Sequence, residues 1–295
     1  MTSYGFGPPS EYGRNAVFRS RTSTVVIEAG SRKVLFDGLA LYLNSSVVRN
    51  GQDWIIAPVD AVDNLGALLF PARALKTAGW TTVVLDPGHG GEDPGALNGR
   101  GVAEKSLTLD IAKRVKSKLR ACRVECRLIR ERDSTVSLDQ RCLLGSRLGA
   151  DLWVSLHLNS SKNRATSGIE TYVLPAAGYS ATSDPERPDA RARYSSCSGN
   201  RFDGANLLLA HCVHKGVVTQ SRAEDRGIRR ARFFVLRNAS CPATLVECGF
   251  LSNPTENSRI LDESYRDTLA EGVARGILTY IGKTWELHLP PVCPQ

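Results

Sequence analysis

The sequence predicts an α/β fold preceded by a small β-rich module. From Thr81 onward, strand-like segments alternate with segments whose apolar residues recur at helical spacing, and this order is typical of an α/β sheet. Residues 21 to about 65 contain short β-branched and aromatic runs punctuated by Gly, Asn and Ser, which favour antiparallel hairpins. With 295 residues, 42% of them hydrophobic, the chain can bury a large core.

The amino-terminal part divides into a leader and the β-rich module. Residues 1–20 are polar and rich in Gly and Pro, so we expect a disordered leader; they lack the apolar region of a signal peptide, and no export signal is visible. No stretch of the chain approaches the ~20 apolar residues of a membrane span. Residues 59–79 mix helical spacing with a Pro and end in Gly, which predicts a connector, so module and connector together span 21–78.

The second domain is predicted to span residues 79–285, with a tail at 286–295. Its expected order is strand TTVVLD, helix 104–121, strand RVECRLIRE, helix 138–149, strands DLWVSLHL and GIETYVL, helix 204–221, strands FFVLR and ATLVEC, and helix 264–283. Residues 175–203 interrupt this order with a polar segment, which predicts a long surface insertion.

Composition narrows the functional classes only partly. The formal charge of +8 favours an anionic partner such as nucleic acid, a membrane surface or the cell wall. Aromatic and basic residues are not interleaved as in a nucleic-acid-binding surface, so we expect no nucleic-acid partner. The eight Cys show no C-x-x-C pair and leave the redox compartment and disulfide pairing open.

Two histidines follow predicted strands directly. His89 lies in the Gly-rich segment Asp86-Pro-Gly-His89-Gly-Gly, and His157 ends the strand DLWVSLHL. Open α/β sheets bind ligands beyond the carboxyl ends of their strands, and two imidazoles suit zinc. Either histidine alone would more often be an ordinary loop or core residue, but their parallel placement favours a shared site.

Two glutamates occupy positions that are otherwise apolar. Glu104 begins a helix on the same stripe as Leu107 and Ile111, so its carboxylate is expected to face the sheet, although an acid there also complements the helix dipole. Glu92 and Asp93 are rival ligands nearby. Glu247 interrupts the apolar strand ATLVEC and must be paired, protonated or functional. A general base would suit that position, and a salt bridge to an Arg is the competing explanation.

Other reactive side chains are assigned structural roles. His211 and His214 are at helical spacing and are assigned to a helix flank rather than to a second metal pair. Cys241 and Cys248 lie near Glu247, but a thiol nucleophile is disfavoured because no His is adjacent in sequence.

These residues resemble a known family. VVLDPGHGG at 83–91, the Glu104 helix, SLHLN at 155–159 and PATLVECGFLSN at 242–253 resemble the zinc-dependent N-acetylmuramoyl-L-alanine amidases of the amidase-3 type. The resemblance covers residues 81 to about 283, including Arg141 and the stretch DRGIRRARFFVLR. It implies a twisted, mostly parallel sheet flanked by helices on both faces.

The resemblance also implies the site and its chemistry. His89, Glu104 and His157 would be the ligands of one Zn²⁺ per chain, and Glu247 the general acid/base. A metal-activated water would then hydrolyse the amide between N-acetylmuramic acid and L-alanine in peptidoglycan. Asp86 or Asn159 are candidates to orient ligands or substrate.

Several expectations follow for partners and location. Peptidoglycan is the expected partner and the periplasm or cell wall the expected location, without integral membrane association. The module faintly resembles a small β domain found in copper amine oxidases and some cell-envelope proteins, so it is interpreted as a wall-targeting or docking module, with a possible activator. In the insertion, Asp184, Glu186 and Asp189 could shield the zinc, or its Arg-rich flanks could grip substrate. Two rival readings remain, a zinc peptidase or amidase acting on another amide and a noncatalytic wall-binding protein.

Overall fold

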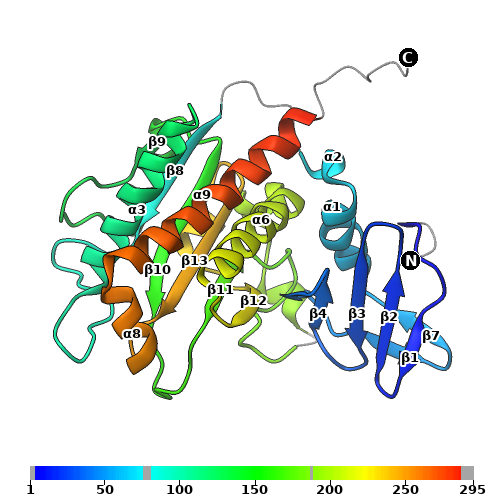
Figure 1. Ribbon diagram of the computed structural model, residues 1–295. Helices are drawn as coiled ribbons and strands as arrows, with labels where there is room; N and C mark the ends of the chain where they lie inside the picture. Colours follow the sequence, from blue (N-terminus) through cyan, green and yellow to red (C-terminus); the bar gives the residue numbers. More distant parts are fainter. Residues whose placement is uncertain (1–3, 76–80, 187–188, 287–295) are drawn as a thin grey trace, which may run out of the picture.

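One sheet runs through the molecule from the amino-terminal strands to the far edge of the α/β part. A computed structural model describes residues 4–75, 81–186 and 189–286. Its eleven-stranded sheet has the order β1-β2-β3-β4-β5-β12-β11-β13-β10-β8-β9 (Figure 1). The strands are β1 Ser10–Tyr12, β2 Asn15–Arg19, β3 Thr24–Glu28, β4 Lys33–Phe36, β5 Leu39–Tyr42, β8 Thr82–Pro87, β9 Glu125–Leu128, β10 Leu152–Asn159, β11 Ile169–Val173, β12 Asp225–Arg230 and β13 Ala243–Phe250. A separate hairpin joins β6 Val48–Asn50 to β7 Asp53–Ile55.

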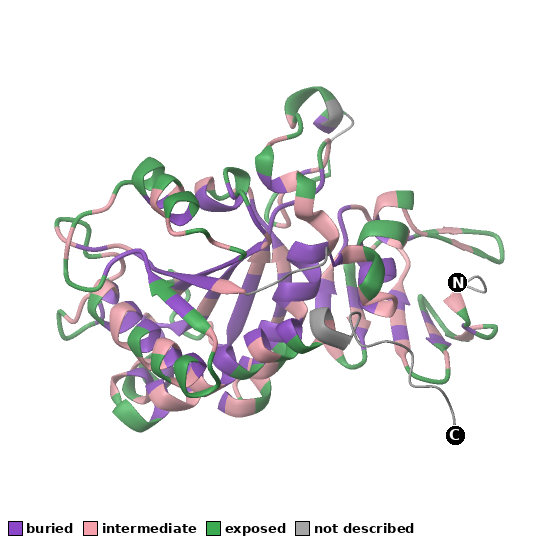
Figure 2. Cartoon of the chain, turned by 90° about the horizontal axis from the view of Figure 1, so that it is seen from above, coloured by how far each residue is buried: buried purple, intermediate pink, exposed green. Residues whose placement is uncertain are grey.

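The centre of the sheet is largely parallel, as the sequence predicts. Strand β10 is parallel to both β8 and β13, and β8 is parallel to β9. Strand β11 runs antiparallel to β13 and parallel to β12, so the sheet is mixed. The apolar residues of β8 and β10 are buried, as expected for strands covered on both faces (Figure 2).

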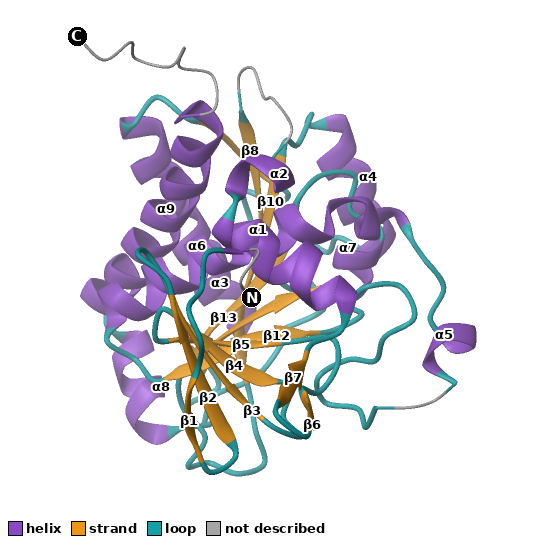
Figure 3. Ribbon diagram, turned by 90° about the vertical axis from the view of Figure 1, so that its right-hand side faces the viewer, coloured by secondary structure: helices purple, strands orange, loops and turns teal. Residues whose placement is uncertain are grey.

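Helices cover both faces of this sheet. Helix α9 packs against both α3 and α6 on one face, and α4 and α7 lie on the other (Figure 3). The longer helices are α3 Glu104–Ala121, α4 Leu138–Arg147, α6 Asp203–Ser221, α8 Pro254–Leu261 and α9 Glu263–Glu286. The Ser137 hydroxyl accepts from the Gln140 backbone and Gln140 caps Ser137 in return, which fixes the start of α4. None of the described helices has the length and apolarity needed to span a membrane.

Two local predictions are wrong. Strands β1 and β2 lie inside the segment expected to be a disordered leader, because Ala16 and Phe18 bury their side chains where β2 pairs with β3. The segment FFVLR forms a helical turn, α7 Phe234–Arg237, and the strand beside β11 is the preceding DRGIRR. A five-residue apolar run does not distinguish a strand from a buried helical turn by periodicity.

The β-rich module is joined to the α/β part by backbone pairing. Strand β5 pairs in parallel with β12, where Leu41 lies opposite Ile228. The connector forms three short helices, η2 Asp60–Leu65, α1 Gly66–Leu69 and α2 Pro71–Ala74. The predicted boundary at 78–79 and residues 287–295 of the predicted tail lie outside the described residues.

The insertion lies against the module rather than the predicted site. It contains two short helices, α5 Ala190–Arg193, which stands apart from the body in Figure 3, and η3 Ser198–Phe202. The Glu186 carboxylate accepts from the backbone N–H of Ser46, and Arg32 of the module donates to the carbonyls of Ser180 and Ala181. In the described part of the chain, the acidic residues of the insertion make no contact with the predicted zinc ligands, so the shielding hypothesis is not supported.

Candidate metal centre

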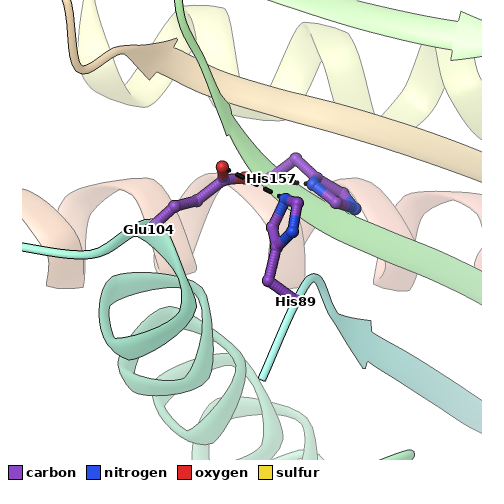
Figure 4. A group of neighbouring side chains, drawn as sticks. All are labelled: His89, Glu104 and His157. Atoms are coloured by element: carbon purple, nitrogen blue, oxygen red, sulfur yellow. Dashed lines mark hydrogen bonds and ion pairs between the residues drawn. The ribbon is translucent and has the colours of Figure 1, made fainter. Parts of the chain in front are cut away.

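Three of the predicted residues converge at the carboxyl end of the central strands. His89 follows β8, Glu104 is the first residue of α3, and His157 lies near the end of β10 (Figure 4). The His89 Nε2 atom lies 3.2 Å from one carboxylate oxygen of Glu104, and the His157 Nδ1 atom lies 3.0 Å from the other. One potential ligand atom from each residue lies within 4.8 Å of the others.

Two imidazoles and a carboxylate are a donor set that suits zinc, and three protein ligands leave a coordination position for water or substrate. Glu104 is 3% exposed and also accepts hydrogen bonds from the backbone N–H groups of Ala96 and Leu158. Burial alone would raise the pKa of Glu104, but its hydrogen bonds to His157 and His89 lower it well below its usual range. The residues therefore fit a divalent cation, with the carboxylate held in its ionised form.

Glycines allow the chain to approach this cluster closely. A Cβ atom at Gly88 would overlap the His157 ring, and one at Gly95 would lie 2.6 Å from both the Glu104 carboxylate and the His89 ring. His89 itself has a left-handed backbone with a φ of 61°. This conformation is costly for a side chain with a Cβ and is typical of positions that a site over-determines.

Buried arginine side chains hold the loop that carries His89 through hydrogen bonds to its backbone carbonyls. Arg141 of α4 donates to the Asp86 carboxylate, to the carbonyl of Pro87 and to the carbonyl of His89. Asp86 also accepts from the Ser155 hydroxyl. Asp86 therefore acts on the site through Arg141, and a second Arg from the adjacent loop, Arg130, donates to the carbonyls of Pro87 and Gly88.

We expect Arg141→Gln to lower the free energy of unfolding by about 3–5 kcal/mol, because it leaves the Asp86 carboxylate buried without its cation. Arg141→Lys keeps the charge but cannot reach all three acceptors, so it should recover part of the stability, while both variants should bind a divalent cation more weakly than the wild type. Urea unfolding and competition with a chelator measure the two effects.

Arg127→Gln, at an exposed pair with Glu125, is the control and should change stability by less than about 1 kcal/mol. Wild-type stability in Arg141→Gln would contradict the assignment.

The rival ligands occupy other positions. Asp93 bonds the Nδ1 atom of His89 at 2.7 Å, on the side of the ring away from Glu104, so it orients the imidazole. Its carboxylate and Glu92 are both exposed. Asn159 donates to Glu170 rather than to the cluster.

Glu247 lies beside the cluster on the neighbouring strand. It is paired in register with His157 of β10 on one side and with Glu170 of β11 on the other. Directly opposite residues point to the same face of a sheet, so the three side chains form a row. Burial, then the nearby Glu104 and Glu170 carboxylates, raise the pKa of Glu247 well above its usual range.

The competing salt-bridge explanation for Glu247 is not supported. Its Oε2 atom is buried and has no hydrogen-bond partner among the described residues. An unpaired buried carboxyl oxygen costs free energy and is typical of a functional group that meets its partner only in a complex.

The other reactive groups have structural partners or are inert. His214 bonds Thr171 and Asp225 on its two ring nitrogens, and His211 packs edge-on against Phe36, so the two do not form a metal pair. All cysteines in the described residues are free, and burial raises the pKa of Cys241 to about 12. A thiol nucleophile is therefore not supported.

A cavity of about 570 Å³ lies at the opposite end of the sheet. Its lining includes Thr81, Leu152 and Pro242, which precede or begin β8, β10 and β13. None of the four predicted site residues lines it.

Fold and site together define an α/β protein with a candidate metal centre at the carboxyl edge of a largely parallel sheet. The sequence matches the family model described as N-acetylmuramoyl-L-alanine amidase over residues 83–279. The chain belongs to this amidase family.

Individual relatives agree with this assignment. The amidase AmiA of Escherichia coli (strain K12) is 29% identical, and the match covers 84% of this chain and 91% of AmiA. The amidase LytC of Bacillus subtilis (strain 168) is 32% identical over 68% of this chain and 35% of LytC. A crystal structure of an N-acetylmuramoyl-L-alanine amidase from Clostridium difficile 630 is 36% identical, with a TM-score of 0.58, over 70% of this chain and 98% of that structure. The match to AmiA is too long to lie within residues 83–295, so it includes part of the β-rich module.

Sequence reasoning missed several supporting residues. Gly88 lies in the Gly-rich segment that the sequence already singles out around His89, but Gly95 and Arg130 give no signal of their own, because their roles depend on approaches between distant segments. Glu170 does give one, since it is an acid in the predicted strand GIETYVL and resembles Glu247 in that respect.

Proposed function

We propose that this amidase hydrolyses the amide between N-acetylmuramic acid and L-alanine in peptidoglycan as a zinc-dependent enzyme. The observation that carries the proposal is the convergence of His89, Glu104 and His157 beside Glu247, whose buried Oε2 atom has no partner among the described residues. Zinc held by the three ligands would lower the pKa of a bound water to about 7 and polarise the lactyl carbonyl.

The chain's own residues supply the proton transfers. Glu247 accepts the proton of the attacking water and delivers it to the departing alanine nitrogen. The first step needs the ionised carboxylate and the second needs the protonated acid; burial raises the pKa of Glu247, which favours the form needed in the second step. No covalent intermediate is required, because water attacks directly.

Product analysis tests this function. Purified protein of known zinc content is incubated with peptidoglycan, and the released fragments are identified by mass spectrometry. We expect stem peptides that begin at L-alanine, a free lactyl carboxylate on the glycan, and about one zinc per chain. Cleavage within the stem peptide would favour a zinc peptidase instead, and binding without release would favour the wall-binding protein.

Location and partners belong to the same proposal. Action on peptidoglycan places the enzyme outside the cytoplasm, at the periplasm or cell wall. One similar structure is the CwlD amidase from Clostridioides difficile in complex with the GerS lipoprotein, 25% identical with a TM-score of 0.57. The β-rich module lies at one end of the sheet, and we propose that a docking partner or activator binds it there.

A further inference from the structure

A charged cluster continues the row of site residues beyond Glu247. Glu170 of β11 is 4% exposed and lies opposite Glu247. Its carboxylate accepts from Asn159 and Tyr172 and lies 3.0 Å and 3.2 Å from the Nε atoms of Arg226 and Arg229. Two guanidinium groups therefore share one carboxylate, at the edge of the candidate site.

The backbone of β12 is irregular where it presents these two arginines. Residues three apart in a regular strand point to opposite faces, yet Arg226 and Arg229 contact the same carboxylate. The pairing of β12 with β11 shifts register between Ile169 and Thr171, and Gly227 has a φ of 92°. A Cβ atom at Gly227 would lie 3.1 Å from the Tyr42 ring. Such bulges re-aim side chains next to active sites.

Arg226 and Arg229 differ in the groups that lie near their terminal guanidinium nitrogens. The Nη1 atom of Arg226 lies 3.8 Å from Glu224, and its guanidinium lies over the Phe250 ring. The Nε atom of Arg229 is used by Glu170 and by the Arg226 carbonyl, and its guanidinium lies 4.9 Å from the centre of the Tyr42 ring. Within the part of the chain that the structure describes, the terminal nitrogens of Arg229 donate no hydrogen bond, and its side chain is 24% exposed.

We propose that Arg229 binds a carboxylate of the stem peptide and makes the enzyme selective for it; this inference rests on the proposed function. Glu170 lies two strands from His157, which corresponds to about 10 Å at ordinary strand spacing. An extended peptide covers that distance in about three residues, so a carboxylate there belongs to the stem rather than to the glycan. Arg226 is a positioning residue that holds Glu170. The Tyr42 ring of the β-rich module packs against the Arg229 guanidinium, the group that would bind the carboxylate.

The test uses two synthetic muramyl peptides, one with free stem carboxylates and one with all of them converted to carboxamides. For the zinc-loaded wild type we expect kcat/KM to favour the carboxylate substrate by about 10-fold or more, as for a charge-assisted hydrogen bond. Arg229→Gln should remove this preference, mainly by raising KM for the carboxylate substrate. Arg229→Lys should restore part of it.

Matched variants separate recognition from structure. Arg226→Gln removes the other cation on Glu170 and should change kcat/KM for both substrates by the same factor. Arg275→Gln, at an exposed ion pair on α9, should leave kcat/KM for both substrates unchanged. If Arg229→Gln keeps the preference for the carboxylate substrate, or lowers kcat/KM for both substrates equally, the inference is overturned. A wild type that cleaves neither substrate contradicts the proposed function instead, and does so before any variant is compared.

Discussion

Glu247→Gln is expected to lower kcat on peptidoglycan by about 1000-fold, within the range for loss of a general acid/base. Glutamine has nearly the same shape but cannot accept the proton of the attacking water or return it to the alanine nitrogen. Zinc content should stay near that of the wild type, because Glu247 lies beside the three ligands and is not one of them. Single-turnover rates and metal analysis of the same preparations measure the two quantities.

Stability provides an independent readout for Glu247. The Oε2 atom is buried without a described partner, and burial raises the pKa of this carboxyl, so an amide in its place should not lower the free energy of unfolding. Glu131→Gln, at an exposed pair with Lys116, is the control and should leave kcat unchanged. A Glu247→Gln enzyme that retains a tenth or more of the wild-type kcat would exclude Glu247 as the acid/base.

Glu104→Ala is expected to abolish both zinc binding and amidase activity. The Glu104 carboxylate is bonded to both histidines and to two backbone N–H groups, so its removal takes away a ligand and leaves the rest of the cluster unsupported. Zinc at 100 times its Kd should stabilise the wild type by about 2.7 kcal/mol, and should not stabilise the variant. Thermal unfolding with and without zinc, after treatment with a chelator, tests this.

Asp93→Asn gives a graded comparison for the metal centre. Asp93 bonds the far side of the His89 ring, and loss of such an outer partner typically weakens metal binding by about 10–100-fold. This variant should regain activity at high zinc concentration, whereas Glu104→Ala should not. Zinc-independent activity in Glu104→Ala would refute the assignment of the metal centre.

The sequence predicts the position of the four central residues well, because carboxyl ends of neighbouring parallel strands must meet at one edge of a sheet. His157 lies near the end of an apolar strand, Glu247 interrupts another, and Glu104 lies on the apolar stripe of a helix, so each is anomalous in its own segment. That they act as metal ligands and acid/base remains a prediction, which the variants above address.

What the sequence does not predict depends on contacts between distant segments. The pairing of β5 with β12 joins residues far apart in the chain and has no local pattern. The bulge at Gly227 lies in a strand that the sequence does not predict, so nothing in the local pattern indicates it, although it helps to set where Arg229 points. The strand β2 is missed because only Ala16 and Phe18 mark its buried face within a polar segment.

The continuous sheet gives the amino-terminal strands a geometric role. A binding module on a flexible linker raises the local concentration of an enzyme but leaves it free to tumble. Here β5 is hydrogen-bonded to β12, and Tyr42 at its end underlies Arg229. If the wall or a partner captures these strands, the catalytic edge would be held at a fixed angle to the surface, so that recruitment would also orient the enzyme toward its glycan strands.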